Sequence, residues 1–589
     1  MAEKIIDFIS GKEVQATPEE VEAVQPFAKT LVEDYGYCKN QIQTHPQYHV
    51  QVRPSDLKKE YPVDIAVFKG TSRDDSDIQI VVECKRKTRK DGLIELQDYL
   101  RFCKAEFGVW FNGSERLFIR KYEHDGKIEF FEIPNIPSKG QRFEDIGLYK
   151  RKDLKATHNL KSIFKAIRNH LAGNTVGTTR DEVLAQQIIN LIFCKIYDER
   201  FTEPEDMCEF RAGYNESASV VKNRIVNLFE KVKRKYKEVI DPDDTIGLDD
   251  NSVFYVVGEL QNYCLIETER DSIADAFETF IGHALKGAQG QFFTPRNVIR
   301  MMVDIVDPGD EDLIIDPSCG SGGFLVESLR HIWKKLEDDG KKYGWSESNL
   351  KEEKLEVALN KIRGIDKDYF LAKVAKAYMA ILGDGKSGIF CEDSLELPSN
   401  WNEKTRIKID KNKFTVLLTN PPFGSKIPVT GDEKLAQYDL GHKWVKGDGG
   451  EWTEGKLKEK ESPQILFIER DVQLLVDRGI MAIVLPDGVF GNENFGYVRT
   501  WLKNHGRILA VLDLPTETFQ PNTATKTSVL VFQKLKKSEI PVDYDIFMAI
   551  ISTCGHDRRG NPTESDEISA VAASYKEWAT KQNILKIED

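Results

Sequence analysis

The sequence lacks any apolar run near the roughly 18 residues that a membrane-spanning helix needs. Its longest apolar stretch, residues 480–486, has the length of a buried strand. The N-terminus lacks the basic, apolar and small-residue order of a signal peptide. The nine cysteines, scattered from Cys38 to Cys554, include no C-x-x-C pair of the kind found in zinc and redox sites. These absences predict a protein of the reducing cytoplasm with no membrane segment.

The chain also lacks an excess of positive charge. Its 83 Lys and Arg side chains against 96 Asp and Glu leave a net charge of −13, which repels bare DNA at long range. A DNA-binding role would therefore need local basic patches or a partner that supplies positive charge.

Hydrophobic patterning divides the 589 residues into regions. Residues 1–150 mix strand-like and helical segments and predict an α/β domain, whereas residues 151–285 show the periodicity of an α-helical domain. In residues 286–535, short β-branched runs recur between helical stretches, which predicts a doubly wound, Rossmann-like α/β domain with a mostly parallel sheet. Residues 536–589 are expected to form a C-terminal tail, and the charged residues 333–354 a surface loop.

A glycine-rich turn, Asp316-Pro-Ser-Cys-Gly-Ser-Gly-Gly-Phe324, follows an apolar strand and leads into an amphipathic helix. Small residues in such a turn let the backbone approach a ligand closely, and Asp316 can bind a cation or orient the loop. The residues concerned are Gly320, Ser321, Gly322 and Gly323. The P-loop and G-x-G-x-x-G patterns are absent, which disfavours nucleoside triphosphates and NAD. A nucleotide-like cofactor is the functional interpretation, and an ordinary tight turn is the alternative.

Two more acidic residues follow predicted strands. Asp366 lies 50 positions after Asp316 and could accept both ribose hydroxyls of a nucleoside, although the spacing in dinucleotide folds is roughly 20. Asp393 could accept the amino group of an adenine ring. Each could instead cap the helix or turn that follows it.

The sharpest motif is Asn420-Pro-Pro-Phe423, directly after a predicted strand. An exocyclic amine is a poor nucleophile because its lone pair is delocalised into the ring. The side-chain oxygen of Asn420 and the carbonyl of Pro421 can accept its two hydrogens, while Pro421 and Pro422 stiffen the loop. A base inside a duplex must be flipped out to reach such a site, and Phe423 offers a face for stacking. The alternative is a strand-terminating turn with one buried aromatic.

The glycine turn followed by Asn420-Pro-Pro-Phe423 resembles the amino-DNA methyltransferases that use S-adenosylmethionine. The segment Gly290-Gln-Phe-Phe-Thr-Pro-Arg296 is similar to the modification subunit of type I restriction-modification systems, and the resemblance covers roughly residues 160–565. It favours N6 of adenine over N4 of cytosine. Methylation at C5 of cytosine is disfavoured because no Pro-Cys pair occurs in the sequence.

The resemblance also implies that a segment before a helix closes over the cofactor. Its residues are Gln291, Phe292, Phe293, Thr294, Pro295 and Arg296. By the same resemblance, Thr294 and Pro295 lie near the methionine end of the cofactor. The residues themselves predict a helix start with Thr294 as N-cap and Pro295 as the first helical residue.

The N-terminal region contains a D…E-x-K arrangement, Asp64 followed by Glu83 and Lys85 on a later strand. The two carboxylates could bind Mg²⁺ while Lys85 steadies water or phosphate. The region resembles the nuclease-like N-terminal domain of type I restriction subunits. A charged strand edge is the alternative, with Arg86, Lys87, Arg89 and Lys90 as a phosphate-attracting patch.

We therefore expect a site-specific adenine-N6 DNA methyltransferase that uses S-adenosylmethionine, the modification subunit of a type I-like system. Its expected partners are double-stranded DNA, a separate specificity subunit and a restriction subunit, because the acidic chain has no obvious recognition domain. The alternative is a Mg²⁺-dependent nuclease, or a fused restriction and modification enzyme, that cleaves DNA with the N-terminal domain.

Overall fold

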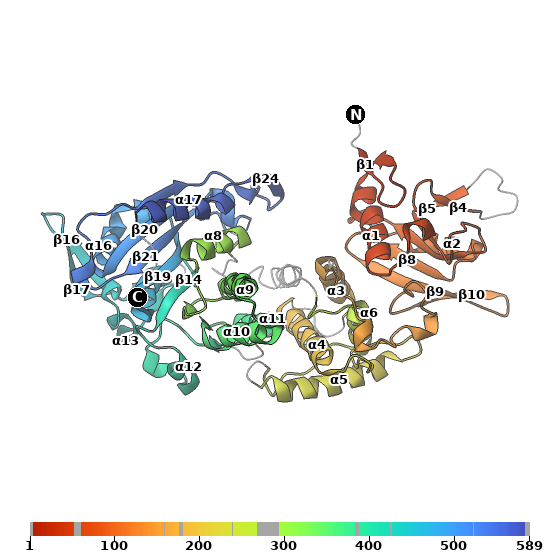
Figure 1. The fold of residues 1–589 in the computed structure, drawn as a ribbon, viewed down its shortest axis with the longest axis horizontal. Helices are drawn as coiled ribbons and strands as arrows, with labels where there is room; N and C mark the ends of the chain where they lie inside the picture. Colours follow the sequence, from red (N-terminus) through yellow and green to blue (C-terminus); the bar gives the residue numbers. More distant parts are fainter. Residues whose placement is uncertain are drawn as a thin grey trace. The chain divides into compact units, whose positions relative to one another are not determined.

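The computed structural model describes residues 4–51, 60–157, 160–175, 181–237, 240–267, 294–382, 388–424, 427–521 and 523–582. The chain divides into two compact units. Unit 1 comprises Met1–Lys235 with Pro242–Leu285, and unit 2 comprises Tyr236–Asp241 with Lys286–Asp589. In Figure 1, unit 1 runs from red to yellow and most of unit 2 from green to blue.

Unit 1 is built on a six-stranded sheet with the order β10-β9-β8-β7-β6-β3. The strands are β3 (Ile42–Gln43), β6 (Ile65–Phe68), β7 (Ile78–Cys84), β8 (Phe107–Phe111), β9 (Arg116–His124) and β10 (Lys127–Glu132). Only β7 and β8 are parallel, and α2 (Leu93–Phe102) connects them. Side chains alternate along β6: Ile65 and Val67 share a core with α1 (Gln25–Glu33), whereas Ala66 and Phe68 pack on the α2 side. Both faces of the sheet are therefore buried at β6.

The helices of unit 1 follow the sheet in sequence: α3 (Leu160–Asn174), α4 (Asp181–Phe201), α5 (Ala218–Lys235) and α6 (Asp250–Leu260). A buried ion pair with a 2.6 Å separation joins Arg116 of β9 to Glu259 of α6. The hairpins β1 (Lys4–Ile6) with β2 (Glu13–Gln15) and β4 (Tyr48–Gln51) with β5 (Glu60–Val63) complete the unit. The sheet and the helices, which we expected as two domains divided near residue 150, thus belong to one unit.

Unit 2 contains an eight-stranded sheet with the order β13-β12-β11-β14-β19-β21-β20-β22. The strands are β11 (Ile314–Asp316), β12 (Ile362–Asp366), β13 (Ile389–Cys391), β14 (Phe414–Thr419), β19 (Leu475–Pro486), β20 (Gly506–Asp513), β21 (Thr527–Lys534) and β22 (Phe547–Ile550). β21 is antiparallel to its two neighbours, and the other pairs are parallel. The predicted doubly wound, mostly parallel sheet is confirmed.

Helices pack along this sheet in two groups (Figure 1). α8 (Arg296–Val306), α9 (Gly323–Tyr343) and α11 (Tyr369–Leu382) lie against one another in turn, and α17 (Ile568–Lys581) packs on α8. α14 (Pro463–Leu474) and α16 (Gly496–His505) share one hydrophobic core with β14 and β19, whose members include Ile468, Trp501, Leu417 and Ile483. The carboxyl ends of β11, β12 and β14 lie at one edge of the sheet, the usual ligand edge of such folds.

Two segments differ from the sequence prediction. Residues 333–354, expected as a loop, lie mostly in α9 and α10 (Glu347–Asn360), because Trp333 is buried and its indole N–H donates to the carbonyl of Lys354 at 2.9 Å. The region after residue 535, expected as a tail, adds β22 to the sheet and α17 to α8. In both segments the apolar residues lie among many charged ones, so the sequence pattern did not predict these helices and the strand.

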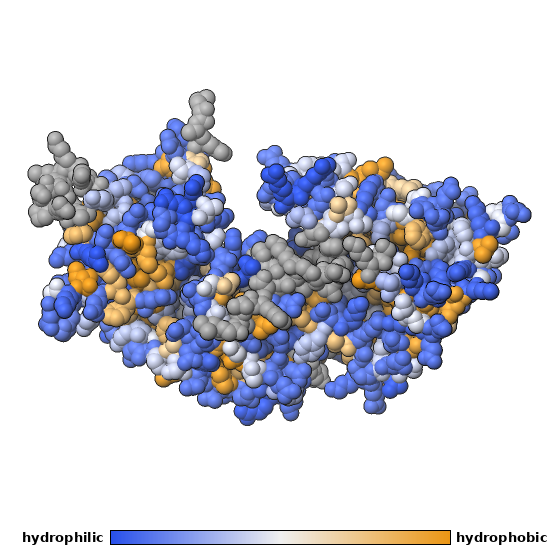
Figure 2. Space-filling view, turned by 180° about the vertical axis from the view of Figure 1, so that it is seen from behind, coloured by the Kyte–Doolittle hydropathy of each residue, from blue (hydrophilic) through white to orange (hydrophobic). Residues whose placement is uncertain are grey.

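The remaining elements are short. They are α12 (Glu403–Lys408), α13 (Asp432–Ala436), α15 (Gly488–Gly491), β15 (Val429–Thr430), β16 (His442–Lys446), β17 (Trp452–Leu457), β18 (Lys460–Glu461), β23 (Cys554–His556) and β24 (Pro562–Asp566). Hydrophilic residues cover most of the face shown in Figure 2, with smaller apolar patches among them. Among the described residues, no helix has both the length and the apolar character to cross a membrane.

Candidate active site

The glycine turn lies between the end of β11 and the start of α9. Gly320 and Gly322 have φ values of 52° and 87°, the left-handed region that favours glycine. A Cβ on Gly322 would lie 3.2 Å from the Cβ of Ala375 in α11, so that glycine allows close packing. A Cβ on Gly320 would meet no atom within 4 Å. The turn therefore packs closely on α11 at Gly322 and is open at Gly320, where a ligand could approach the backbone.

Two buried carboxylates organise this turn. The Oδ2 of Asp366, at the end of β12, accepts the N–H of Gly320 at 2.8 Å, and its Oδ1 accepts the N–H of Asp368 at 2.8 Å. The Oδ1 of Asp316 accepts the hydroxyl of Thr419 at 2.7 Å and the N–H of Ser318 at 3.0 Å. Burial raises the pKa of Asp316 to about 7 and that of Asp366 to about 6. Both groups are poised near neutrality at the ligand edge.

Asp393 has partners within the chain. Its Oδ1 accepts the N–H of Leu395 at 2.9 Å, as a turn-capping aspartate does, and its Oδ2 accepts the ammonium of Lys434 at 2.5 Å. The structure thus contains the capping contact that the sequence offered as the alternative. A contact between Asp393 and an adenine ring stays a prediction, and it would have to coexist with the Lys434 pair.

Asn420 is the first residue after β14, and its side-chain nitrogen and oxygen differ in their hydrogen bonding. Its side-chain amide donates to Thr294 Oγ1 at 3.0 Å. Its side-chain oxygen is buried and has no hydrogen-bond partner among the described residues. A buried acceptor without a donor is costly, about 1–3 kcal/mol. The free oxygen is therefore suited to a donor that arrives with a ligand.

The neighbours of Asn420 differ in part from the sequence prediction. The N-cap of α8 is Pro295, with no side-chain cap, so the predicted capping role of Thr294 is wrong: its hydroxyl contacts Asn420. Phe423 is only 6% exposed, as the alternative of a turn with one buried aromatic expects, and its stacking on a flipped base stays a prediction. Gln291, Phe292 and Phe293 lie outside the described residues.

Sequence reasoning missed Asp471 on α14. This side chain is fully buried, and neither carboxylate oxygen has a hydrogen-bond partner among the described residues. Burial, together with the negative charge of Asp316, raises the pKa of Asp471 well above its ordinary value. The signal available in the sequence was the charged run Glu469-Arg470-Asp471, which directly follows the apolar residues 465–468.

The D…E-x-K residues do come together in unit 1. Asp64, directly before β6, accepts the N–H of Cys84 at 2.7 Å, and Glu83 accepts the ammonium of Lys85. Lys85 also pairs with Glu95 of α2 at 2.8 Å. Burial raises the pKa of Asp64 to about 7; burial and the charge of Asp64 raise that of Glu83 to about 9. The carboxylates of the partly buried Asp64 and the buried Glu83, the first of which raises the proton affinity of the second, can accept a divalent cation.

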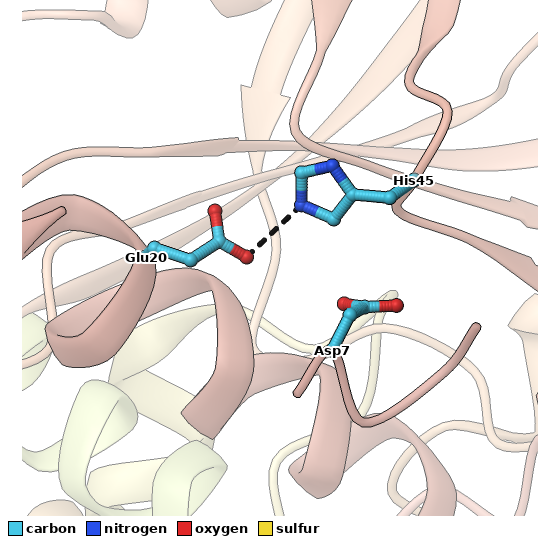
Figure 3. Close-up of side chains that lie close together, drawn as sticks. All are labelled: Asp7, Glu20 and His45. Atoms are coloured by element: carbon cyan, nitrogen blue, oxygen red, sulfur yellow. Dashed lines mark hydrogen bonds and ion pairs between the residues drawn. The ribbon is translucent and has the colours of Figure 1, made fainter. Parts of the chain in front are cut away.

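A second acidic cluster lies nearby and was not predicted (Figure 3). The Nε2 of His45 lies 3.0 Å from Glu20 Oε1, and the amide of Gln25 donates to both Asp7 and Glu20, at 2.8 and 2.7 Å. Burial alone would raise the pKa of Asp7, but hydrogen bonds from Gln25, Ser10 and Thr44 lower it. Asp7 and Glu20 are thus already satisfied within the chain, and the cluster links β1 to α1 and to the loop before β4.

Comparison with known proteins bears on both units. The family model described as N-6 DNA Methylase matches residues 268–587, and that of the type I restriction enzyme R protein N terminus matches residues 18–137. The EcoEI methylase subunit of Escherichia coli is 28% identical over 45% of this chain and 47% of its own length. The EcoKI methylase subunit of Escherichia coli K12 is 21% identical over 59% and 62%, respectively.

The chain thus spans about half the length of the curated relatives it matches. A solved structure that concerns complex assembly and conformational transition of the type I R-M system matches this chain with a TM-score of 0.50 at 18% identity. That match covers 73% of this chain and 85% of the solved one. This likeness concerns the fold alone.

Proposed function

The chain belongs to the N-6 DNA methylase family, whose model matches more than half of its 589 residues, and we propose that it methylates the N6 amino group of adenine in DNA. One observation carries this proposal: the buried, unpartnered side-chain oxygen of Asn420 beside the glycine turn. The amino group of a flipped adenine would supply the missing hydrogen-bond donor. N4 of cytosine offers the same two hydrogens and is the competing target base.

The described residues fit S-adenosylmethionine as the methyl donor. The open side of Gly320 leaves room for a ligand against the backbone, and the carboxylates of Asp316 and Asp366 lie at the ends of adjacent strands. We infer that the turn and Asp366 hold the nucleoside part. When bound, S-adenosylmethionine supplies a methyl group already activated by its positive sulfur.

The chain's own contribution to the reaction is alignment of the acceptor amine. Thr294 holds the amide of Asn420 so that the side-chain oxygen is free to accept one amine hydrogen. The carbonyl of Pro421 would accept the second hydrogen, and Pro422 limits movement of the loop. Two acceptors draw the nitrogen toward tetrahedral geometry and localise its lone pair. Preorganised acceptors therefore raise the reactivity of the amine without a strong base.

DNA recognition requires more than this chain in the proposed assembly. The relatives are named methylase subunits of type I restriction enzymes, and this chain carries a net charge of −13. We propose that a separate specificity subunit reads the target sequence and that a restriction subunit joins the complex. All nine cysteines are free thiols, which suits the reducing cytoplasm that we propose as its location.

The test is methyl transfer from labelled S-adenosylmethionine to DNA by the chain together with the proposed specificity subunit. Asn420→Ala should abolish transfer while donor binding persists. Asn349→Ala, an exposed asparagine on α10, is the matched control and should retain activity. Equal activity of Asn420→Ala and the wild-type protein would refute the proposal. Mapping the labelled nucleoside distinguishes N6-methyladenine from N4-methylcytosine.

A second candidate activity, DNA cleavage by unit 1, is supported by the match of residues 18–137 and by the juxtaposition of Asp64, Glu83 and Lys85. We propose that Asp64 and Glu83 hold Mg²⁺ there. Mg²⁺-dependent nicking that is lost in Asp64→Ala and retained in Asn420→Ala would establish it. No nicking by the wild-type protein, with methyl transfer intact, would leave unit 1 without this activity.

A further inference from the structure

Three cations lie along one face of α3 in unit 1. Lys161, Lys165 and Arg168 are spaced four and three residues apart, which places them on one stripe of the helix. A neighbouring stripe of the helix is apolar and buried. Its residues are Leu160, Ile163, Phe164, Ile167 and Leu171. Packing of that apolar stripe fixes the direction in which the three cations project.

A fourth cation reaches this stripe from the segment after β7. The pKa of Lys165 is lowered by partial burial and then by the positive charge of Lys87, with Lys161 and Arg168 adding to the effect. Glu22, which accepts the backbone N–H of Lys87 at 2.9 Å, acts in the opposite direction. We name Lys87, Lys161, Lys165 and Arg168 the cation seam. At Lys165, the positive charges of the other three members outweigh the negative charge of Glu22.

Three other lysines of unit 1, by comparison, are neutralised by nearby carboxylates. Lys150 and Lys152 both pair with Glu205, at 3.1 and 2.7 Å, and Lys222 pairs with Asp250 at 3.0 Å. Among the described residues, by contrast, no carboxylate forms an ion pair with Lys87, Lys161 or Lys165. An acidic chain that keeps mutually repelling lysines together is suited to an anion from outside.

We propose that the cation seam binds the phosphate backbone of a DNA duplex. It would be a second DNA-contacting surface, and this inference rests on the proposed function, in which DNA is the substrate. The seven-residue step from Lys161 to Arg168 spans about 10 Å, roughly three phosphate steps of 3.4 Å along one strand. The seam is a line of charges in which Lys87 and Lys161 are exposed and the other two are partly exposed, which fits a polyanion better than a small anion. Lys87 lies two residues after Lys85, so the same duplex would extend toward Asp64 and Glu83.

The test is the salt dependence of binding between the full-length protein and a fluorescein-labelled DNA duplex of arbitrary sequence, followed by anisotropy. Each phosphate contact contributes about 0.9 to the slope of log K against log salt. The double variant Lys161→Ala with Lys165→Ala should lower this slope by about 2, whereas the two Lys→Arg replacements should keep it. Lys150→Ala with Lys152→Ala removes the same charge from a neutralised pair and should leave the slope unchanged. Far-UV circular dichroism checks folding of every variant.

The outcomes separate this proposal from the proposed function. An unchanged slope in the seam variant, or an equal fall in the Lys150 and Lys152 control, would overturn the seam even if methyl transfer is intact. If the seam variant showed the lower slope only with double-stranded RNA of equal length, and not with DNA, the assignment to DNA would be overturned. A seam-dependent slope in a protein that transfers no methyl group would retain the seam and reject the proposed function.

Discussion

Asn420 and Thr294 are joined by a 3.0 Å hydrogen bond across 126 residues of sequence. Asn420 follows the central strand β14, and Thr294 lies just before α8, so the contact links the sheet to a helix that covers it. It uses the side-chain N–H of Asn420 and leaves the side-chain oxygen buried without a partner among the described residues. The orientation of the amide is therefore set by a residue distant in the sequence.

Loss of this contact should impair turnover more than binding. Thr294→Val removes the partner of the Asn420 amide while conserving shape, and we expect kcat for methyl transfer to fall about tenfold, the equivalent of roughly 1.4 kcal/mol. KM for DNA should change little, because Thr294 acts on alignment. Thr294→Ser keeps the hydroxyl and serves as control. A valine variant with unaltered kcat would contradict the role of Thr294.

Asp366 should determine donor affinity through the glycine turn. Asp366→Asn places an amide N–H against the backbone N–H of Gly320 or Asp368. We therefore expect the Kd for S-adenosylmethionine to rise about 10- to 100-fold, the usual effect of losing a hydrogen bond to a charged group. Equilibrium dialysis with labelled donor measures this. Asp368→Asn is the matched control, because asparagine can still cap α11, where Asp368 accepts the N–H of Leu371. Equal affinities of both variants would refute the prediction.

Asp471 should make unit 2 less stable as the pH rises. Its pKa is raised well above its ordinary value in the folded protein, whereas in the unfolded chain it returns to about 3.9. Above that pH the unfolded chain releases the proton and the folded protein keeps it, so the free energy of unfolding falls with rising pH. Asp471→Asn should remove this contribution and be more stable than wild type at pH 8.

Urea unfolding at pH 5 and pH 8 tests this prediction. The difference in unfolding free energy between the two pH values should shrink in Asp471→Asn. Asp338→Asn on α9, where the carboxylate is 65% exposed, should leave it unchanged. A pH dependence equal to that of the wild-type protein in Asp471→Asn would contradict the assignment.

Cation binding to unit 1 should strengthen with pH. The pKa values of Asp64 and Glu83, about 7 and about 9, mean that protons compete with Mg²⁺ at neutral pH. Calorimetric titration should therefore give a lower Kd for Mg²⁺ at pH 8.5 than at pH 6.5. Asp64→Asn should abolish the binding, whereas Asp98→Asn at an exposed pair should not. Binding retained in Asp64→Asn would contradict the assignment of the ion to Asp64 and Glu83.

The sequence alone determined the strands and turns that carry the motifs. Runs of β-branched residues fall in β11, β12, β14, β19, β20 and β21, because burial on both faces of a mostly parallel sheet favours apolar side chains along the strand. The glycine turn and Asn420 could be found for a related reason: each directly follows such a strand. Local pattern was misleading at residues 333–354, where charged residues lie on helices anchored by single buried side chains such as Trp333.

Tertiary structure decided which atoms are free. Asn420 and Thr294, Gly320 and Asp366, and Asp471 and Asp316 come from segments far apart in the chain, and no spacing rule relates them. Hydrogen-bond satisfaction and burial are properties of three-dimensional neighbours. The sequence therefore identified the chemical groups at the ligand edge, whereas only packing determined which are occupied, which are left without a partner, and which keep their protons at neutral pH.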